Sequence, residues 1–229
     1  MKAPAWLVGL REAAASLLFS AHCPVCASSV ETPGSWCAPC LSRTVRPHRL
    51  TLSREALATI DDAWAVGFYG SALGALIRDL KYRGRRAAIP YIRTALSAAE
   101  LPKTLRCADL AVCVPLHEAR RKERGFNQVE LIFADWLKAQ GIVVQRPLER
   151  RRATLPQYGL GEKERRRNMR GAFFLREAGE GGAGELLGKR ILLLDDIMTT
   201  GETLLSCAAV LRQAGVASVQ VLVLASDRS

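Results

Sequence analysis

The stretch ILLLDDIMTTGETL, residues 191–204, decides the fold of this chain and carries its most informative chemistry. Its four leading apolar residues, 191–194, predict a buried strand. Two carboxylates, Asp195 and Asp196, follow at the carboxyl end of that strand, where open α/β sheets bind ligands. A turn rich in threonine then leads into a predicted helix at residues 202–214. The stretch therefore predicts a strand–turn–helix unit of an α/β fold.

The turn that follows the acid pair suits a phosphate group. Free N–H groups and the positive end of a helix dipole attract anions, and Gly201 permits close backbone approach. Carboxylates beside such a turn accept hydrogen bonds from ribose hydroxyls, so a sugar phosphate fits both parts. The alternative interpretation is structural, with the acids capping the helix. Two adjacent ionised acids at a mostly buried strand end are costly without partners, which favours ligand binding.

Strands and helices alternate on both sides of this stretch. We predict strands at residues 62–69, 110–114, 142–144, 172–175, 191–194 and 219–224. We predict helices at residues 72–80, 87–99, 128–140 and 202–214. Asn127 and Gly141 are the expected caps of the third helix. Residues 148–170 are predicted as a long polar loop. Alternation of this kind predicts a parallel sheet with right-handed crossovers.

Two C-x-x-C turns, CPVC at 23–26 and CAPC at 37–40, stand ten residues apart near the N-terminus. Together they offer four thiolates, which predict a structural Zn²⁺ site with no open coordination position. The proposed ligands are Cys23, Cys26, Cys37 and Cys40. Four unrelated cysteines, or a redox pair, are the alternatives. The remaining cysteines, Cys107, Cys113 and Cys207, are predicted to be buried thiols.

The composition is that of a globular protein with anionic partners. The 229 residues are 49% hydrophobic, which supports a core and excludes disorder as the dominant state. A net charge of +11 suggests phosphates or nucleic acid as partners. Residues 115–170 hold 14 basic and 7 acidic side chains, so the excess is concentrated there. A solvated surface is the alternative interpretation of these basic clusters.

The N-terminal segment predicts neither a membrane span nor a secretory signal. No apolar run approaches the roughly 20 residues that a membrane helix needs. Arg11 and Glu12 interrupt the first apolar stretch, which has no typical cleavage site after it. We expect an amphipathic helix that leads into the cysteine turns, and a cytoplasmic location.

Five motifs in order resemble known families. Residues 191–204 resemble the phosphoribosyl pyrophosphate (PRPP) motif of type I phosphoribosyltransferases. The other four resemble the ComF family of bacterial phosphoribosyltransferase-like proteins associated with competence and DNA uptake. They are KYRGR at 81–85, VPLH at 114–117, RGFNQ at 124–128 and a pattern from Gln157 to Phe173. The resemblance implies an N-terminal helix at 1–22, a zinc ribbon at 23–45 and, at 60–229, a type I phosphoribosyltransferase-like parallel sheet flanked by helices.

The resemblance also implies roles for particular residues. Asp195 and Asp196 would contact the ribose 2′- and 3′-hydroxyls. The 5′-phosphate loop would comprise Thr199, Thr200, Gly201, Glu202 and Thr203. Glu202 contributes only its backbone N–H, since its charge is unfavourable near phosphate unless the side chain turns outward. The turn at Pro115, Leu116 and His117 would hold pyrophosphate, with Arg120, Arg121 and Arg124 neutralising it. A flap at 154–168, with Gln157, Arg165 and Asn168, would close over PRPP.

An enzyme of this kind displaces pyrophosphate at ribose C1 by a nitrogen nucleophile, with Mg²⁺ on the pyrophosphate. No catalytic residue is assigned, because positioning and charge stabilisation dominate such a reaction. The chain ends after its last strand, so we expect any hood over the acceptor to come from residues before 108. Trp64, Tyr69 and Tyr82 are the aromatic residues considered for it, although core packing is the favoured role.

Two functions follow from these observations. The first is a phosphoribosyltransferase with an unidentified acceptor. The second is a non-catalytic PRPP- or nucleotide-binding accessory protein in DNA uptake, which contacts single-stranded DNA and a competence helicase. A zinc-ribbon transcription factor is a third interpretation, but it leaves the acid pair and the phosphate loop without a purpose.

Overall fold

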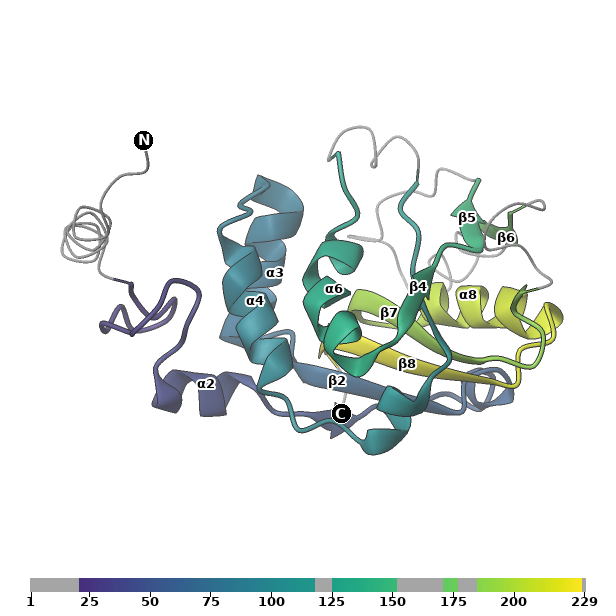
Figure 1. Cartoon of the computed structure of the whole chain (residues 1–229), viewed down its shortest axis with the longest axis horizontal. Coiled ribbons are helices and arrows are strands. Elements are labelled where there is room, and N and C mark those ends of the chain that lie inside the picture. The colour runs from purple at the N-terminus through teal and green to yellow at the C-terminus, as the bar shows by residue number, and fades with distance from the viewer. Residues whose placement is uncertain (1–20, 118–124, 152–170, 177–184, 228–229) are drawn as a thin grey trace, which may run out of the picture.

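The computed structural model describes residues 21–117, 125–151, 171–176 and 185–227, which form a six-stranded sheet with helices on both faces (Figure 1). Its strands are β1 (His48–Arg49), β2 (Asp62–Phe68), β3 (Leu110–Cys113), β4 (Val143–Gln145), β7 (Arg190–Met198) and β8 (Ser218–Ser226). Across the sheet they lie in the order β1-β2-β8-β7-β3-β4. Neighbours are parallel except β1 and β2. The predicted α/β class with a mostly parallel sheet is confirmed.

Alternating side chains of β7 belong to two separate cores. Leu192 and Leu194 pack with α3 (Ala72–Arg83), α4 (Ala88–Ser97) and α6 (Gln128–Gln140). Ile191 and Leu193 pack on the other face with α8 (Glu202–Gln213). The apolar run at 191–194 is therefore buried on both faces, as a central parallel strand requires.

The helix caps of α6 agree with the sequence. The Asn127 side chain accepts a hydrogen bond from the Val129 N–H at 3.0 Å, which caps the helix start. Gly141 ends the helix with φ at 70°, a conformation that favours glycine. The Asn127 amide also donates to the Val114 carbonyl at 3.2 Å, so the cap ties the helix to the end of β3.

Two elements differ from the expected boundaries. Strand β7 continues through the acid pair to Met198, because β8 pairs with it as far as Ser226. Residues 148–150, expected in a loop, form β5 (Leu148–Arg150), which pairs antiparallel with β6 (Phe173–Leu175). Leu148 and Phe173 are 2% and 3% exposed, so burial of these side chains holds the two-stranded ribbon on the domain.

The connections that follow β3 and β7 determine where a ligand can bind on the sheet. Strand β3 leads through α6 to β4, on one side, whereas β7 leads through α8 to β8, on the other. These neighbouring strands therefore lie where the strand order reverses. The helices that follow them lie on opposite faces (Figure 1). A crevice opens at such a point, outside the carboxyl ends of the strands, and it is where α/β sheets bind ligands.

Candidate functional site

The acid pair lies in the last part of β7, past the end of its neighbour β3. Successive strand residues point to opposite faces, so the two carboxylates diverge. Asp196 is 5% exposed and faces α3 and α6, where Lys81 and Gln128 contact it. Asp195 is partly exposed, lies on the α8 side and accepts a hydrogen bond from the Asp196 N–H at 2.8 Å. The predicted pair is thus brought to the crevice, but as two separate groups.

Burial and the neighbouring charge of Asp196 set the ionisation of Asp195. Burial, followed by the charge of Asp196, raises the pKa of Asp195 to about 8. Burial alone would lower the pKa of Lys81, but Asp196 and Asp195 outweigh it and raise the pKa. Ionisation of Asp195 near neutral pH therefore needs further positive charge or hydrogen-bond donors at this edge. Ligand hydroxyls, or a cation bound with the ligand, can supply them.

The loop between β7 and α8 has the geometry expected for an anion. Gly201 is the N-cap of α8 with φ at 84°, and a Cβ there would lie 3.3 Å from the Met198 Cε. With glycine at the cap, no side chain of this N-cap bonds the first N–H groups of the helix. Thr199, Thr200 and Thr203 are partly exposed around it.

Glu202 differs from the expectation of an outward side chain. It is 7% exposed and lies on the flank of α8, where it lines a cavity with Phe173 and Leu205. The side chain is thus buried rather than turned outward to solvent.

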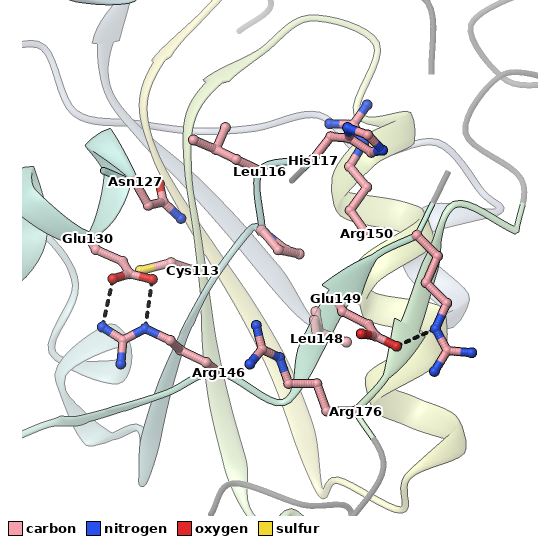
Figure 2. A pocket seen from close by; sticks show the side chains of 12 residues that line it. Cys113, Leu116, His117, Asn127, Glu130, Arg146, Leu148, Glu149, Arg150 and Arg176 are labelled. Atoms are coloured by element: carbon pink, nitrogen blue, oxygen red, sulfur yellow. Dashed lines mark hydrogen bonds and ion pairs between the residues drawn. The ribbon is translucent and has the colours of Figure 1, made fainter. Parts of the chain in front are cut away.

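A cavity of about 480 Å³ opens beside the carboxyl end of β3 (Figure 2). Pro115, Leu116 and His117, the residues of the predicted pyrophosphate turn, line it. Its other lining residues are Cys113, Asn127, Glu130, Arg146, Leu148, Glu149, Arg150, Arg151 and Arg176. Four arginines against two glutamates leave these lining residues a net charge of +2 (4 − 2). The cavity therefore suits an anion.

Two of these arginines are held by the glutamates of the same cavity. Arg146 binds Glu130 through two hydrogen bonds of 2.9 and 2.7 Å, and Arg151 binds Glu149. The Arg150 guanidinium lies 5.5 Å from the centre of the Phe173 ring. The prediction of a loop at residues 148–170 placed Arg150 and Arg151 in irregular structure, and the sequence analysis assigned no role to Arg146.

The described residues test only part of the predicted pyrophosphate and flap sites. The following predicted residues lie outside them: Arg120, Arg121, Arg124, Gln157, Arg165 and Asn168. The N-terminal helix predicted at 1–22 also lies almost wholly outside. The strands on either side of residues 152–170, β5 and β6, pair with each other, so the described residues that flank the predicted flap lie side by side.

A hood over the acceptor from residues before 108 stays a prediction. The cavity beside β3 is lined in part by the two-stranded ribbon and its flanks, at Arg146, residues 148–151 and Arg176. Trp64 donates its indole N–H to Asp62 at 2.9 Å and packs against the core, as Tyr69 does. Tyr82 alone of the three aromatic residues is strongly exposed, at 65%.

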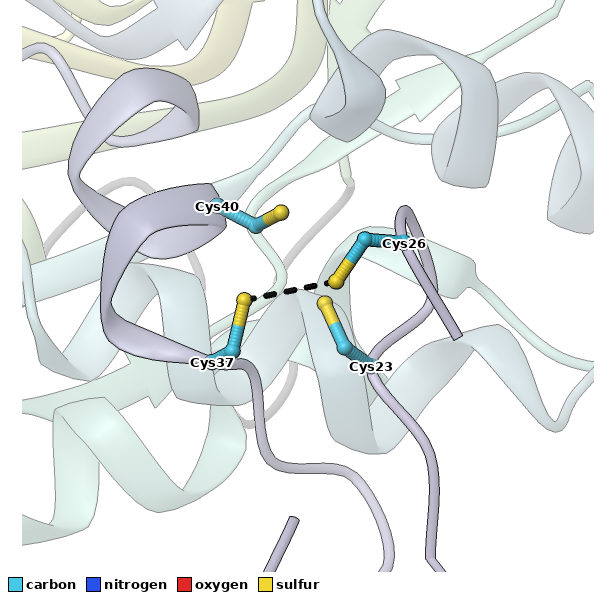
Figure 3. A group of neighbouring side chains, drawn as sticks. All are labelled: Cys23, Cys26, Cys37 and Cys40. Carbon is cyan, nitrogen blue, oxygen red and sulfur yellow. Dashed lines mark hydrogen bonds between the residues drawn. The ribbon is translucent and has the colours of Figure 1, made fainter. Parts of the chain in front are cut away.

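The four N-terminal cysteines lie together, with all sulfurs within 4.8 Å of one another (Figure 3). All are free thiols, and Cys26 Sγ lies 3.5 Å from Cys37 Sγ. Burial opposes ionisation of Cys23, but backbone N–H groups outweigh it and lower its pKa to about 6. Its neighbours, Cys37 first, raise the pKa of Cys40 to about 12. Four thiolates this close need a cation, and an all-sulfur set fits Zn²⁺.

The segment that holds the four cysteines, residues 23–40 (the cysteine module), packs on α4. The Trp36 indole N–H donates to the Tyr91 carbonyl at 2.9 Å, and the Thr94 hydroxyl donates to the Gly34 carbonyl at 2.9 Å. A Cβ at Gly34 would lie 2.5 Å from the Pro90 Cβ, so the close approach requires glycine. Cys23, Trp36 and Cys40 belong to the core that α3, α4 and α6 share.

Two of the three remaining cysteines are buried as predicted, and the third is exposed. Cys113 and Cys207 are buried, as predicted, and burial raises the pKa of both thiols. Cys107 is exposed, which corrects the prediction for that residue. It ends a short 3-10 helix, Lys103–Cys107, that turns its last residue to solvent.

Comparisons with known proteins agree with this architecture. The family model for the phosphoribosyl transferase domain matches residues 159–229. The DNA utilization protein YhgH of Escherichia coli O157:H7 is 30% identical over 215 residues, which cover 87% of each chain. Competence protein F of Haemophilus influenzae is 27% identical over 207 residues, covering 87% of this chain and 82% of the relative. Among the described residues, none of the helices has the length and apolar character needed to cross a membrane.

Proposed function

The chain belongs to the ComF family of competence-associated, phosphoribosyltransferase-like proteins, and we propose that it binds PRPP or a related ribose 5-phosphate where β3 and β7 diverge. The observation that carries the proposal is the acid pair beside the open N-terminus of α8 at this point of the sheet. Carboxylate oxygens accept from ribose hydroxyls, and the N–H groups and hydroxyls of residues 199–203 bind the 5′-phosphate.

The arginine-lined cavity beside Pro115, Leu116 and His117 suits the pyrophosphate arm of the same ligand. Mg²⁺ bound with that arm supplies further neutralising charge. The chain's own residues then orient the ribose and hold the leaving group, which is most of what displacement at C1 needs. The transferase activity that we propose is attack of a nitrogen nucleophile on C1, on an acceptor that the sequence does not name.

Calorimetric titration of Mg²⁺ and PRPP into the purified protein tests this proposal. We expect saturable binding, and its loss by at least about 100-fold in Asp195→Asn/Asp196→Asn, because two charge-assisted hydrogen-bond acceptors are removed. The control Glu100→Gln/Asp135→Asn removes the same two charges at exposed positions and should bind normally. Absence of binding by the unaltered protein, or equal binding by both double variants, would contradict the proposal.

A role in DNA uptake is proposed from the relatives, which are named for competence and for DNA utilization. The basic block at residues 115–170 is the part of the chain that would contact single-stranded DNA, and a helicase is the proposed protein partner. Seven free cysteines fit the reducing cytoplasm, where we place this role.

Salt dependence distinguishes direct DNA contact from an accessory role without it. If several phosphates are neutralised by this block, affinity for an oligothymidylate should fall by about 10³-fold or more between 50 and 200 mM salt. Fluorescence anisotropy with a labelled strand measures this directly. An affinity that is weak at low salt and unchanged across this range would remove DNA from the proposed function, and PRPP binding would stand without it.

A further inference from the structure

Among the described residues, Tyr82 has the most exposed aromatic side chain, at 65%, and it lies in the last turn of α3. Phe174 and Phe68 follow, at 40% and 37%. A single exposed ring carries little information on a protein surface. What distinguishes Tyr82 is its position, because the residue before it in the chain reaches the acid pair.

Lys81 connects Tyr82 with both acids of the pair. The Lys81 Nζ lies 3.3 Å from the Asp196 Oδ2. Burial would lower the pKa of Lys81, but Asp196 and then Asp195 outweigh it, and Tyr82 adds to their effect. The two carboxylates and the Tyr82 phenol therefore lie around one ammonium group. The exposed ring of Tyr82 is thus near the proposed ribose site.

Helix α3 is fixed on this edge of the sheet. A Cβ at Gly74 would lie 1.8 Å from the Tyr69 carbonyl oxygen, so the helix packs directly on the turn that follows β2. Arg78 covers the same turn, because its guanidinium donates to that carbonyl at 3.2 Å and lies 4.7 Å from the centre of the Tyr69 ring. These contacts hold the first half of α3 at the carboxyl end of β2, and the place of its last turn follows from them.

The corner after Tyr82, which joins α3 to α4, is held from two sides. Arg83 and Arg85 both bind Asp79, at 2.9 and 3.1 Å. The Arg86 guanidinium lies 4.3 Å from the centre of the Phe126 ring, two residues before the start of α6. Helices α3, α4 and α6 pack on the same face of the sheet (Figure 1). Tyr82 is therefore presented by a preorganised part of the chain, which lowers the cost of binding a ligand.

We propose that Tyr82 binds the acceptor: its exposed ring stacks on a planar aromatic heterocycle and holds a ring nitrogen toward ribose C1. This inference rests on the proposed function and deepens it by naming the class of acceptor. The acid pair and the phosphate loop bind the sugar phosphate, so the acceptor needs a further contact. Core packing, the role favoured for Tyr82 from the sequence, does not fit a ring that is 65% exposed.

The charge of the corner selects among nitrogen nucleophiles. Residues 79–86 carry four basic side chains and one acidic side chain, a net charge of +3 (4 − 1). A protonated aliphatic amine would be repelled there, and it has no flat face to stack. A neutral heterocycle has such a face, and stacking on tyrosine accepts any planar ring.

The transfer step balances with such an acceptor. The lone pair of the ring nitrogen forms the bond to C1, and the C1–O bond breaks with its electron pair leaving on pyrophosphate. The proton of a ring N–H is released to solvent. Tyr82 takes no part in these bond changes, since its role is to hold the ring in place.

Calorimetric titrations with ligands that share the sugar phosphate test the proposal. The ligands are ribose 5-phosphate, adenosine 5′-monophosphate and uridine 5′-monophosphate, each with Mg²⁺. We expect at least one nucleotide to bind about 5- to 150-fold more tightly than ribose 5-phosphate, the range for stacking of one base on an aromatic side chain. Tyr82→Leu should remove most of this advantage and leave the affinity for ribose 5-phosphate unchanged.

Two further variants are the controls. Tyr82→Phe keeps the ring and should keep the advantage of the nucleotide. Phe68→Leu removes another exposed ring, which stacks on His48 at 4.2 Å, and should bind all three ligands normally. Because Tyr82 is exposed, Tyr82→Leu should unfold at the Tm of the unaltered protein, which thermal unfolding checks.

The ligands also separate this inference from the proposed function. If ribose 5-phosphate binds and neither nucleotide binds more tightly, or if the advantage survives in Tyr82→Leu, the inference is overturned and the proposed function stands. If ribose 5-phosphate does not bind, the proposed function fails. Nucleotide binding that depends on Tyr82 would then support the aromatic contact alone, and no binding of any ligand would overturn both.

Discussion

Asp195→Asn should stabilise the folded protein at neutral pH while it removes PRPP binding. Burial and the neighbouring Asp196 raise the pKa of Asp195 to about 8, well above that of an aspartate in an unfolded chain. The folded state therefore retains a proton between about pH 4 and pH 8 that the unfolded state releases. The free energy of unfolding falls across this window as pH rises, and the loss is complete above it.

Asparagine removes this cost without removing the local hydrogen bond. Its side-chain oxygen still accepts from the Asp196 N–H, which donates to Asp195 at 2.8 Å. The Lys81–Asp196 ion pair also loses a repulsive neighbour. We expect a gain of about 2 kcal/mol at pH 8, or roughly 4–8 °C in Tm for a chain of this size, and little gain near pH 4.

Thermal unfolding between pH 4 and pH 8.5 measures this difference. Asp109→Asn is the matched control, because its ion pair with Arg190, at 2.7 Å, lowers the pKa of Asp109 to about 2. That variant should lose stability and leave PRPP binding unchanged. A Tm for Asp195→Asn that is equal to or below that of the unaltered protein at pH 8 would show that Asp195 is not held under strain.

The fold was predictable because its central strands are simple apolar runs. Residues 191–194 are buried on both faces of the sheet, and Asn127 and Gly141 mark the ends of α6 by their own conformational preferences. Strand β5 carries no such pattern. It has one buried apolar residue, Leu148, and it exists because it pairs with β6. Pairing between segments that are distant in the chain cannot be predicted from the local sequence.

The place of the candidate site on the sheet was predictable, but the contacts of its two carboxylates were not. The acid pair and the following loop identify the carboxyl end of β7 from residues 191–204 alone. The continuation of β7 to Met198, which separates the two carboxylates, depends on pairing with β8. Lys81 and Gln128 are 115 and 68 residues from Asp196 in the chain, so their contacts depend on how α3 and α6 pack. The motifs that contain Lys81 and Gln128 indicated the family but not their contacts with Asp196.

Removal of the metal from the cysteine module should destabilise the whole domain. We expect one zinc per chain by elemental analysis of the purified protein. Structural zinc sites contribute on the order of 10 kcal/mol to the folding of small modules. Cys23 and Cys40 lie in the core shared with α3, α4 and α6, so loss of metal would leave buried thiolates there with no cation to neutralise them. A strong chelator, or Cys37→Ala, should lower the Tm by about 10 °C or more, at roughly 2–4 °C per kcal/mol.

The effect should reach the ligand site through α4. Trp36 and Gly34 bind the module to this helix, and the Arg93 guanidinium of α4 binds the Leu131 carbonyl of α6 at 2.5 and 3.1 Å. Helices α3 and α6 carry the side chains that hold Asp196, so PRPP binding should weaken together with the loss of metal. Cys107→Ala, at an exposed thiol outside the cluster, should change neither property. A metal-free preparation with an unchanged Tm would instead make the four thiols a redox or unrelated group, and the coupling through α4 would have no cause.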